Sequence, residues 1–396
     1  MRTPHAIQGR THPPLPTSIH RPIRNARWRQ RLCFTARALA VALLSGILAA
    51  SADPTPDAGP WRLYSTLRTL QYGGPQPLHQ LFNELEGPQA PNGKDRMLSL
   101  AHLEVGVANT SWSLGFFFRH DYMARFSPDT IELLYRDKND LPVRTDATYD
   151  LWIDVHHLEA QGLRIQFPRL VAGPLEFAVG LSLFHATGLL DGSGRGTIET
   201  GASSYVGSAR LNYRYDQDLL LDRKVDPPEG WGAGFDLSLS WRPRPGTLWT
   251  MDVRDLGARI RWRDAPYTRA LVTSSTLTFD ENGFIETSPL LSGVESNKDA
   301  TQHLPIQLRT TIRQRLTTGW TALAAFEQYD DVRLPSLGIQ TNRGNWTGWA
   351  GWQWETNAVE LGWGRGHTRL RLLIDQLDPD RITTAGLEFS FRPGSL

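Results

Sequence analysis

Charged side chains recur at every second position in several segments of this chain. Arg309, Arg313 and Arg315 occupy alternate positions of one expected strand, and Arg369 and Arg371 occupy alternate positions of another. Because successive side chains of an extended strand point to opposite faces, each set lies on one face of its strand. Two interpretations stay open: an interior packed with ion pairs, or a basic track that guides an anionic or amphipathic solute. Spacing cannot decide between them, because the register between strands is not known from the sequence.

Other alternating segments carry further charged residues on their polar side. Opposite charges that meet inside a barrel pair with one another, so these residues are candidates for lining a lumen. The basic candidates are Arg164, Arg210, Arg214 and Arg254, and the acidic candidates are Glu176, Asp236, Asp252, Glu360, Asp375 and Glu388.

Catalytic and metal-binding patterns are weak in this sequence. His156, His157 and Glu159 form the densest group of metal-ligating types. In a strand, however, His156 and His157 point to opposite faces and cannot bind one ion together without a bulge. Ser182 and His185 diverge for the same reason, and no phosphate-binding loop or dinucleotide fingerprint occurs. We therefore expect no metal, no cofactor and no enzymatic activity.

The element that must position these side chains is a β-strand with one apolar and one polar face. Residues 235–241, Phe-Asp-Leu-Ser-Leu-Ser-Trp, alternate cleanly, and similar alternation returns along most of the chain. Near the C-terminus, strands are expected at 307–316, 320–328, 346–354, 358–365, 368–375 and 385–392. All such segments together predict about 14 antiparallel strands, with 12 to 16 allowed, because bacterial barrels usually close with an even number.

The N-terminus has the pattern of an export signal. Residues 1–52 contain eight Arg, no Lys and no acidic residue, and the apolar run 38–49 is too short to span a membrane comfortably. Residues 50–52, Ala-Ser-Ala, fit a cleavage site after Ala52. An organelle transit peptide is the alternative, because the segment is Arg-rich and acid-poor. A signal peptide fits better, because the segment is also poor in Ser.

Cleavage after Ala52 changes the charge of the chain. It leaves 34 basic and 41 acidic residues, a net charge of −7, which argues against a nucleic-acid partner. The one cysteine, Cys33, lies in the predicted signal peptide, so the mature chain has no disulfide. The mean hydropathy of −0.37 argues against a helical membrane protein but allows a barrel, whose strands need an apolar residue only at every second position.

A secreted soluble β-protein would show the same alternation of polar and apolar residues as a membrane barrel. The positions of the aromatic residues favour the membrane barrel. The chain has 14 Trp, and many of them fall near expected strand ends. Indole prefers the boundary between lipid and water, where barrels collect aromatic girdles. The tryptophans near strand ends are Trp112, Trp231, Trp241, Trp262, Trp320, Trp346 and Trp354.

Three parts of the chain are expected from these patterns. Residues 1–52 form the signal peptide, 53–96 a linker with an N-terminal plug or cap segment, and 97–396 the barrel. The leucines of 61–96 are spaced as in short helices, so this segment either enters the barrel or packs against its rim. A long connection from about 264 to 306 is a second candidate for a gate.

One stretch resembles a known family. Val253 begins the sequence Val-Arg-Asp-Leu-Gly, which contains Asp255, Leu256 and Gly257, and Ile-Arg-Trp follows, ending at Trp262. This stretch resembles a strand motif of fatty-acid-transport-porin-like outer-membrane proteins, which run Val-x-Asp-Leu-Gly and then Ile-x-Trp. A Thr-Phe-Asp segment follows in that group, as it does here at 278–280.

The resemblance covers about 50 residues and implies fold and place more than activity. It implies a barrel of about 14 strands, sometimes with an N-terminal plug, and either passage of hydrophobic solutes or scaffolding of export machinery. No catalytic residue is carried over. The terminal strand 387–392 also resembles the C-terminal signal by which the barrel assembly machinery recognises its clients, although Pro-Gly-Ser-Leu follows its last aromatic residue.

We therefore expect an all-β, antiparallel transmembrane barrel in the bacterial outer membrane, in contact with its lipid. The leading functional hypothesis is passive transport of a small amphipathic or hydrophobic solute, and an anionic solute fits the arginine-rich faces. The rival from another class is a non-conducting structural or assembly scaffold.

Overall fold

The computed structural model describes residues 61–109, 111–201, 205–218, 223–274, 277–279, 285–287 and 291–392. The predicted signal peptide 1–52, its cleavage site at Ala52 and the linker 53–60 lie outside the described residues. So do Asp280 of the Thr-Phe-Asp segment and the residues that follow the last strand, 393–396.

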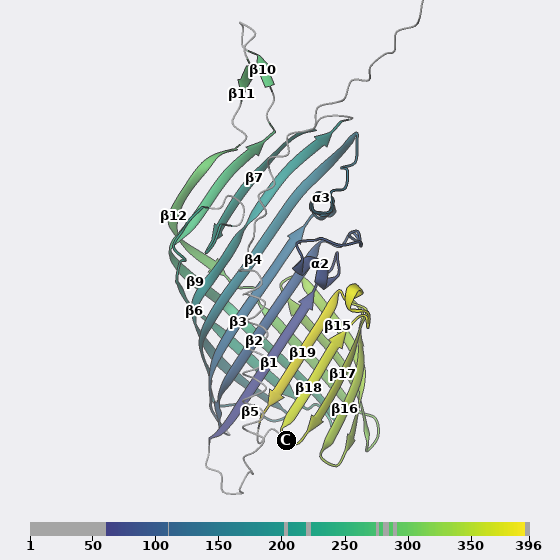
Figure 1. Cartoon of the computed structure of the whole chain (residues 1–396). Helices are drawn as coiled ribbons and strands as arrows, with labels where there is room; N and C mark the ends of the chain where they lie inside the picture. The colour runs from purple at the N-terminus through teal and green to yellow at the C-terminus, as the bar shows by residue number, and fades with distance from the viewer. Residues whose placement is uncertain are drawn as a thin grey trace, which may run out of the picture.

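A single antiparallel sheet closes on itself to form a barrel (Figure 1). The first strand, β1 (Arg62–Tyr72), pairs on one side with β2 (Arg96–Ala108) and on the other with the last strand, β19 (Thr384–Phe391). The other long wall strands are β3 (Ser113–Phe126), β4 (Ala147–Gln166), β6 (Leu175–Thr200), β7 (Tyr205–Tyr215), β8 (Gly230–Trp241), β9 (Thr247–Thr273), β12 (Leu291–His303), β13 (Gln307–Arg315), β14 (Trp320–Tyr329), β15 (Val332–Arg343), β16 (Trp346–Gln353), β17 (Ala358–Arg365) and β18 (Thr368–Ile374).

The wall has 14 strand positions, so the predicted fold class is confirmed. Two positions are each occupied by two strands in succession. Both β7 and β8 pair with β6, and both β12 and β13 pair with β9, because the chain leaves the wall and returns at the same position.

Short elements decorate the barrel. Strand β5 (Leu170–Ala172) pairs with β6, and β10 (Leu277–Phe279) pairs with β11 (Ile285–Thr287) away from the wall. The helical pieces among the described residues are α2 (Leu78–Phe82), α3 (Pro128–Lys138) and the 3-10 turn η1 (Pro379–Arg381). No helix in the described part of the chain is long and apolar enough to cross a membrane.

The two ends of the barrel differ in the length of their connections. Five connections of two to five residues, such as β8–β9 and β15–β16, lie at one end, here called the short-turn end. The longest connections, 73–95, 127–146 and 274–290, lie at the opposite, long-loop end. In Figure 1 the short-turn end is at the bottom, where the chain also ends.

Two segments that the sequence assigned to a plug or a gate belong to the wall. Residues 62–72 form β1, which closes the barrel, so the barrel begins there and not at residue 97. The helix-like spacing of Leu63, Leu67 and Leu70 was misleading, because two neighbouring strands supply hydrogen bonds to this segment that no isolated helix could match. Residues 73–95 connect β1 to β2 at the long-loop end. Most of 264–306 lies in β9 and β12.

The outer face of the wall is apolar at mid-height. Phe116, Leu163 and Leu183 are neighbours in register on β3, β4 and β6, and their exposed fractions are 42%, 45% and 42%. Contiguous exposure of large apolar side chains over several strands is typical of a surface that meets lipid. The alternation of the sequence thus gives the wall an outer face on which large apolar side chains are exposed.

Exposed tryptophans ring the short-turn end. Trp112, Trp241, Trp320 and Trp346 each lie next to a short turn and are exposed, as expected of an aromatic girdle. Trp262 departs from the prediction, because it is 1% exposed and packs inside the barrel. Trp262 follows backbone irregularities at Asp255 and Gly257 of β9, which change the face on which later side chains lie.

The wall is irregular halfway along β9. Asp255 and Gly257 have φ angles of +63° and +62°, a backbone region that Asp and Gly adopt more readily than most residues. The register with β8 shifts between Ala233 and Leu237. On the other side, the pairing with β13 ends at Arg254, and the pairing with β12 begins only at residue 259. The segment 255–258 thus forms a bulge that turns the Asp255 side chain into the barrel.

Candidate functional site

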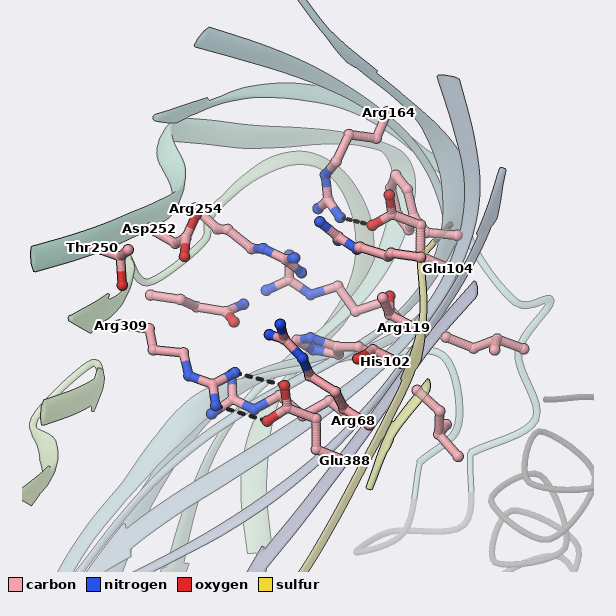
Figure 2. Close-up of a pocket in the computed structure, with 18 of the residues that line it drawn as sticks. Arg68, His102, Glu104, Arg119, Arg164, Thr250, Asp252, Arg254, Arg309 and Glu388 are labelled. Carbon is pink, nitrogen blue, oxygen red and sulfur yellow. Dashed lines mark hydrogen bonds and ion pairs between the residues drawn. The ribbon is translucent and has the colours of Figure 1, made fainter. Parts of the chain in front are cut away.

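A buried ion-pair network crosses the middle of the lumen, and Glu327 of β14 is at its centre. Glu327 lies 2.5 Å from Arg68 of β1, 3.2 Å from Arg309 of β13 and 2.7 Å from Arg371 of β18. Arg309 also forms a bidentate pair with Glu388 of β19, at 2.9 and 2.8 Å (Figure 2). One carboxylate thus forms ion pairs with guanidinium groups from three strands that are distant from one another in the sequence.

Arg371 completes this network through Glu360 of β17, whose two oxygens lie 2.7 Å from its nitrogens. The network contains the arginines Arg68, Arg309 and Arg371 and the glutamates Glu327, Glu360 and Glu388. Its formal charges therefore balance, and we call these six residues the Glu327 network.

A second group lies on the opposite wall around Arg164 of β4. Its Nε is 2.8 Å from Asp236 of β8, and its Nη1 pairs closely with Glu104 of β2. The hydroxyl of Tyr64 donates to Glu104 at 2.6 Å, and the Arg164 guanidinium lies over the Phe117 ring. Both carboxylates nearest Arg164 are therefore already occupied.

A third group fixes the bulge in β9. Arg119 of β3 donates to the Asp255 carboxylate at 2.9 Å and also pairs closely with Asp121. His102 lies 2.5 Å from Asp121, and Gln307 donates to Asp255 at 2.9 Å. The Asp255 side chain is fully buried, so these charge-assisted bonds replace the strand pairing that the bulge interrupts.

Towards the long-loop end, inward side chains meet across the barrel and form two apolar clusters. One joins Leu98 of β2 and Met123 of β3 to Leu334 of β15 on the far wall. The other joins Phe184 of β6 to Trp262 of β9. In the described part of the chain, apolar side chains therefore occupy part of the lumen above the ion pairs.

Towards the short-turn end the lumen is hollow. A cavity of about 670 Å³ adjoins one of about 330 Å³, and Arg164, Arg254, Arg313, Arg369 and Arg392 line one or both. We call this space the basic chamber. Its carboxylates Glu104 and Asp236 are held by Arg164, and Glu388 is held by Arg309. Figure 2 shows Arg254 and Arg119 extending towards the centre of the lumen.

Three arginines of the basic chamber have no ion-pair partner within 4.0 Å among the described residues: Arg254, Arg313 and Arg369. The Arg313 Nε is in addition buried without a hydrogen-bond partner. Of the other carboxylates that line the chamber, Glu176 pairs with Arg242, and Asp252 accepts a hydrogen bond from Ser238 at 2.7 Å. The chamber therefore holds more unpaired positive than negative charge.

One side of the chamber is apolar. A third cavity of about 190 Å³ is lined by Arg313, Arg369 and Trp349, together with Leu323 and Ala325. The indole nitrogen of Trp349 donates to Glu360 at 3.1 Å, which fixes the ring in place. Guanidinium groups beside an indole form a surface that suits a solute with an anionic head and an apolar body.

Gly362 of β17 makes room for that indole. A Cβ atom at this position would lie 1.7 Å from Cε2 of Trp349, in the body of the ring and not at a flexible end. We expect Gly362→Ala to displace Trp349 and to lower the free energy of unfolding by about 1–3 kcal/mol. Gly319→Ala is the control, because its Cβ would contact nothing within 4 Å. Equal denaturant midpoints for both variants would contradict this account of Trp349.

The structure brings most of the predicted lumen residues together. The predicted residues that line the three cavities are Arg164, Arg254, Arg309, Arg313, Arg369, Arg371, Glu176, Asp236, Asp252, Glu360 and Glu388.

Four predicted lumen residues do not line these three cavities. Arg210 and Arg214 lie on β7, beyond the filled part of the lumen, and the Arg214 guanidinium stacks on Tyr267 at 5.6 Å. Arg315 is exposed beside the β8–β9 turn. Asp375 accepts from the Thr383 backbone and ties the β18–β19 connection. Each has the correct parity or charge for a lumen, but its height on the wall places it outside the cavities.

The sequence also missed residues that matter. Arg68 and Arg119 lie in segments where polar and apolar residues do not alternate strictly. Glu104 lies in a segment that does alternate, and Glu327 is the single acidic residue of its strand. The available signal was charge within an otherwise apolar strand, which is costly unless a partner is present.

Comparisons with known proteins address the fold. No family model matches this chain, and no curated protein matches it. Among solved structures, the toluene transporter TodX of P. putida is similar with a TM-score of 0.41 and 11% identity, over 85% of this chain and 91% of TodX. The toluene transporter TbuX of Ralstonia pickettii has a TM-score of 0.41 and 9% identity, over 83% and 89%. A FadL homologue of Pseudomonas aeruginosa has a TM-score of 0.24 and 11% identity, over 83% and 88%.

The fold and the lumen define the class of this protein: a closed antiparallel β-barrel of 14 strand positions with an apolar outer face and a charged interior. TM-scores below 0.5 and identities near 10% do not define its family or its solute. The resemblance carried by Asp255, Leu256, Gly257 and Trp262 stays a prediction.

Proposed function

We propose that this chain passes a small amphipathic solute across the outer membrane and is not a general open pore. The observation that supports this most is the basic chamber, with its three unpaired arginines, beneath a layer of ion pairs and apolar clusters. A general pore needs a continuous aqueous path, and apolar clusters in the lumen oppose such a path. A fixed binding surface beside a barrier is what a selective route needs.

The chamber opens towards the short-turn end. Bacterial barrels place short turns on the periplasmic side and longer loops outside, so this end faces the periplasm. A solute that enters from outside must then cross the apolar clusters before it reaches the guanidinium groups. An apolar body favours the first step and an anionic head favours the second, which is why we propose an amphipathic, carboxylate-bearing solute.

Removal of the unpaired charges tests the proposal. In Arg254→Gln, Arg313→Gln and Arg369→Gln combined, we expect influx of benzoate into liposomes to fall about tenfold or more. Loss of about 1.4 kcal/mol of attraction is a tenfold effect, and three guanidinium groups near one carboxylate exceed that value. Influx of uncharged benzyl alcohol should change little. Arg343→Gln, beside the β15–β16 turn and outside the cavities, is the matched control.

Stability should not account for the loss. These arginines have no close carboxylate, so their removal relieves repulsion and leaves the denaturant midpoint unchanged or higher. Equal benzoate influx in the triple variant and the wild type would contradict the role of the chamber.

A non-conducting scaffold is the second candidate, and the filled lumen favours it. A scaffold gives no influx of either probe, whereas a selective route gives influx without large conductance steps in a planar bilayer. Under both proposals the barrel assembly machinery would insert the chain, with β19 as the terminal strand. Neither proposal assigns a catalytic step.

A further inference from the structure

A compact group of ligating side chains lies on the outer face of β3 and β4. His120 of β3 is opposite Glu159 of β4 in register, and His157 lies two residues before Glu159 on the same face. The His120 Nδ1 atom is 3.3 Å from the Glu159 Oε1 atom, and the His157 Nε2 atom is 3.9 Å from it. One ligand atom from each residue falls within 4.8 Å of the other two.

A hydrogen bond to the backbone fixes the orientation of the His157 ring. Its Nδ1 atom lies 3.0 Å from the backbone oxygen of Asp121, so Nδ1–H donates there and the lone pair of Nε2 points towards Glu159. Histidines that bind metals typically donate their other ring N–H to a carboxylate or a backbone carbonyl. The His157 side chain is buried, and the two imidazole rings lie 4.9 Å apart at 60° to one another.

These three groups form a known type of coordination set. We propose that His120, His157 and Glu159 bind one divalent transition-metal ion, of which Zn²⁺ is the representative. Zn²⁺ takes imidazole nitrogen and carboxylate oxygen at about 2.0–2.2 Å, which sets tetrahedral ligand atoms about 3.4 Å apart. The two distances to the Glu159 Oε1 atom, 3.3 and 3.9 Å, are close to this value, and the ligand atoms of the two histidines lie within 4.8 Å of each other.

The ligand types exclude the harder ions. Two imidazoles and one carboxylate suit Zn²⁺, Ni²⁺, Co²⁺ or Cu²⁺, whereas Ca²⁺ and Mg²⁺ need a shell of oxygens. Three protein ligands leave the fourth position open to water or to an outside ligand. His156, which the sequence grouped with His157, lies on the opposite face and is 2.6 Å from Asp191, so it does not take part.

The site is separate from the lumen. Arg119 and Asp121 flank His120 in sequence and point inward, so His120 points outward. It lies four residues beyond Phe116 of the apolar belt, towards the long-loop end. Binding here therefore does not depend on the proposed transport route, and the two proposals can fail independently.

Zinc titration of the refolded full chain, in detergent and without an added histidine tag, tests the proposal. We expect one tight site in the wild type, measured by competition with a chromogenic chelator. His120→Gln and Glu159→Gln should each weaken it by more than a hundredfold, because even residues that only orient a ligand contribute ten- to hundredfold. His156→Gln is the matched control and should bind as the wild type does. His5, His12 and His20 are common to every variant.

Cobalt gives an independent readout. Co²⁺ bound to the wild type should show the strong visible absorption of a four-coordinate ion, and this band should be missing in His120→Gln. Heat-modifiable migration on a gel shows that each variant is folded. A folded wild type that does not compete with the chelator overturns the proposal, and so does a His120→Gln chain that binds zinc as tightly as the wild type.

Discussion

Replacing Glu327 by Gln should lower the free energy of unfolding by about 3–5 kcal/mol, the usual cost when one member of a buried ion pair is removed. Glu327 pairs with three arginines from three strands, and its side chain is only 8% exposed. Gln keeps the shape and an acceptor but leaves one buried positive charge without compensation. The measurement is urea-induced unfolding of the barrel in short-chain lipid vesicles.

A double-mutant cycle separates charge balance from shape. Among the described residues Arg68 forms one ion pair, with Glu327, so Arg68→Gln combined with Glu327→Gln restores neutrality in the Glu327 network. We expect the double variant to be more stable than Glu327→Gln alone. If the two losses simply add, the network is not held by charge, and the solvent of the lumen screens these pairs as it does at a surface.

The fold was predictable because its cause is local. Alternation such as Phe235 to Trp241 specifies a strand with one apolar face, and an exported chain with many such strands has a stable solution in a closed barrel. Strand β1 was missed because its leucines also fit a helical spacing, and the pairing with β2 and β19 that decides the matter is not local.

The site was only partly predictable because it depends on register. Parity along one strand correctly placed Arg309 and Arg371 on inward faces, but it cannot show that Glu327 meets both. The same limit hid the ligand set on the outer face. His157 and Glu159 share a face, and their third member, His120, comes from a neighbouring strand 37 residues earlier in the chain.

The second large effect is expected at Asp255. Asp255→Ala should lower the free energy of unfolding by about 3–5 kcal/mol, through two separable causes. Alanine in the left-handed backbone region costs about 1–2 kcal/mol. Loss of the carboxylate also leaves Arg119 with Asp121 alone and removes the acceptor for Gln307, and an unpaired buried group costs a further 1–3 kcal/mol.

Gly257→Ala isolates the first cause, because its φ is +62° and its Cβ would meet nothing within 4 Å. We expect this variant to lose about 1 kcal/mol of the free energy of unfolding. Asp255→Asn, which tolerates the same backbone region, should fall between the two alanine variants. If Asp255→Ala and Gly257→Ala lower the free energy of unfolding equally, the backbone alone maintains the bulge in β9. The contacts of Asp255 with Arg119 and Gln307 would then not stabilise it.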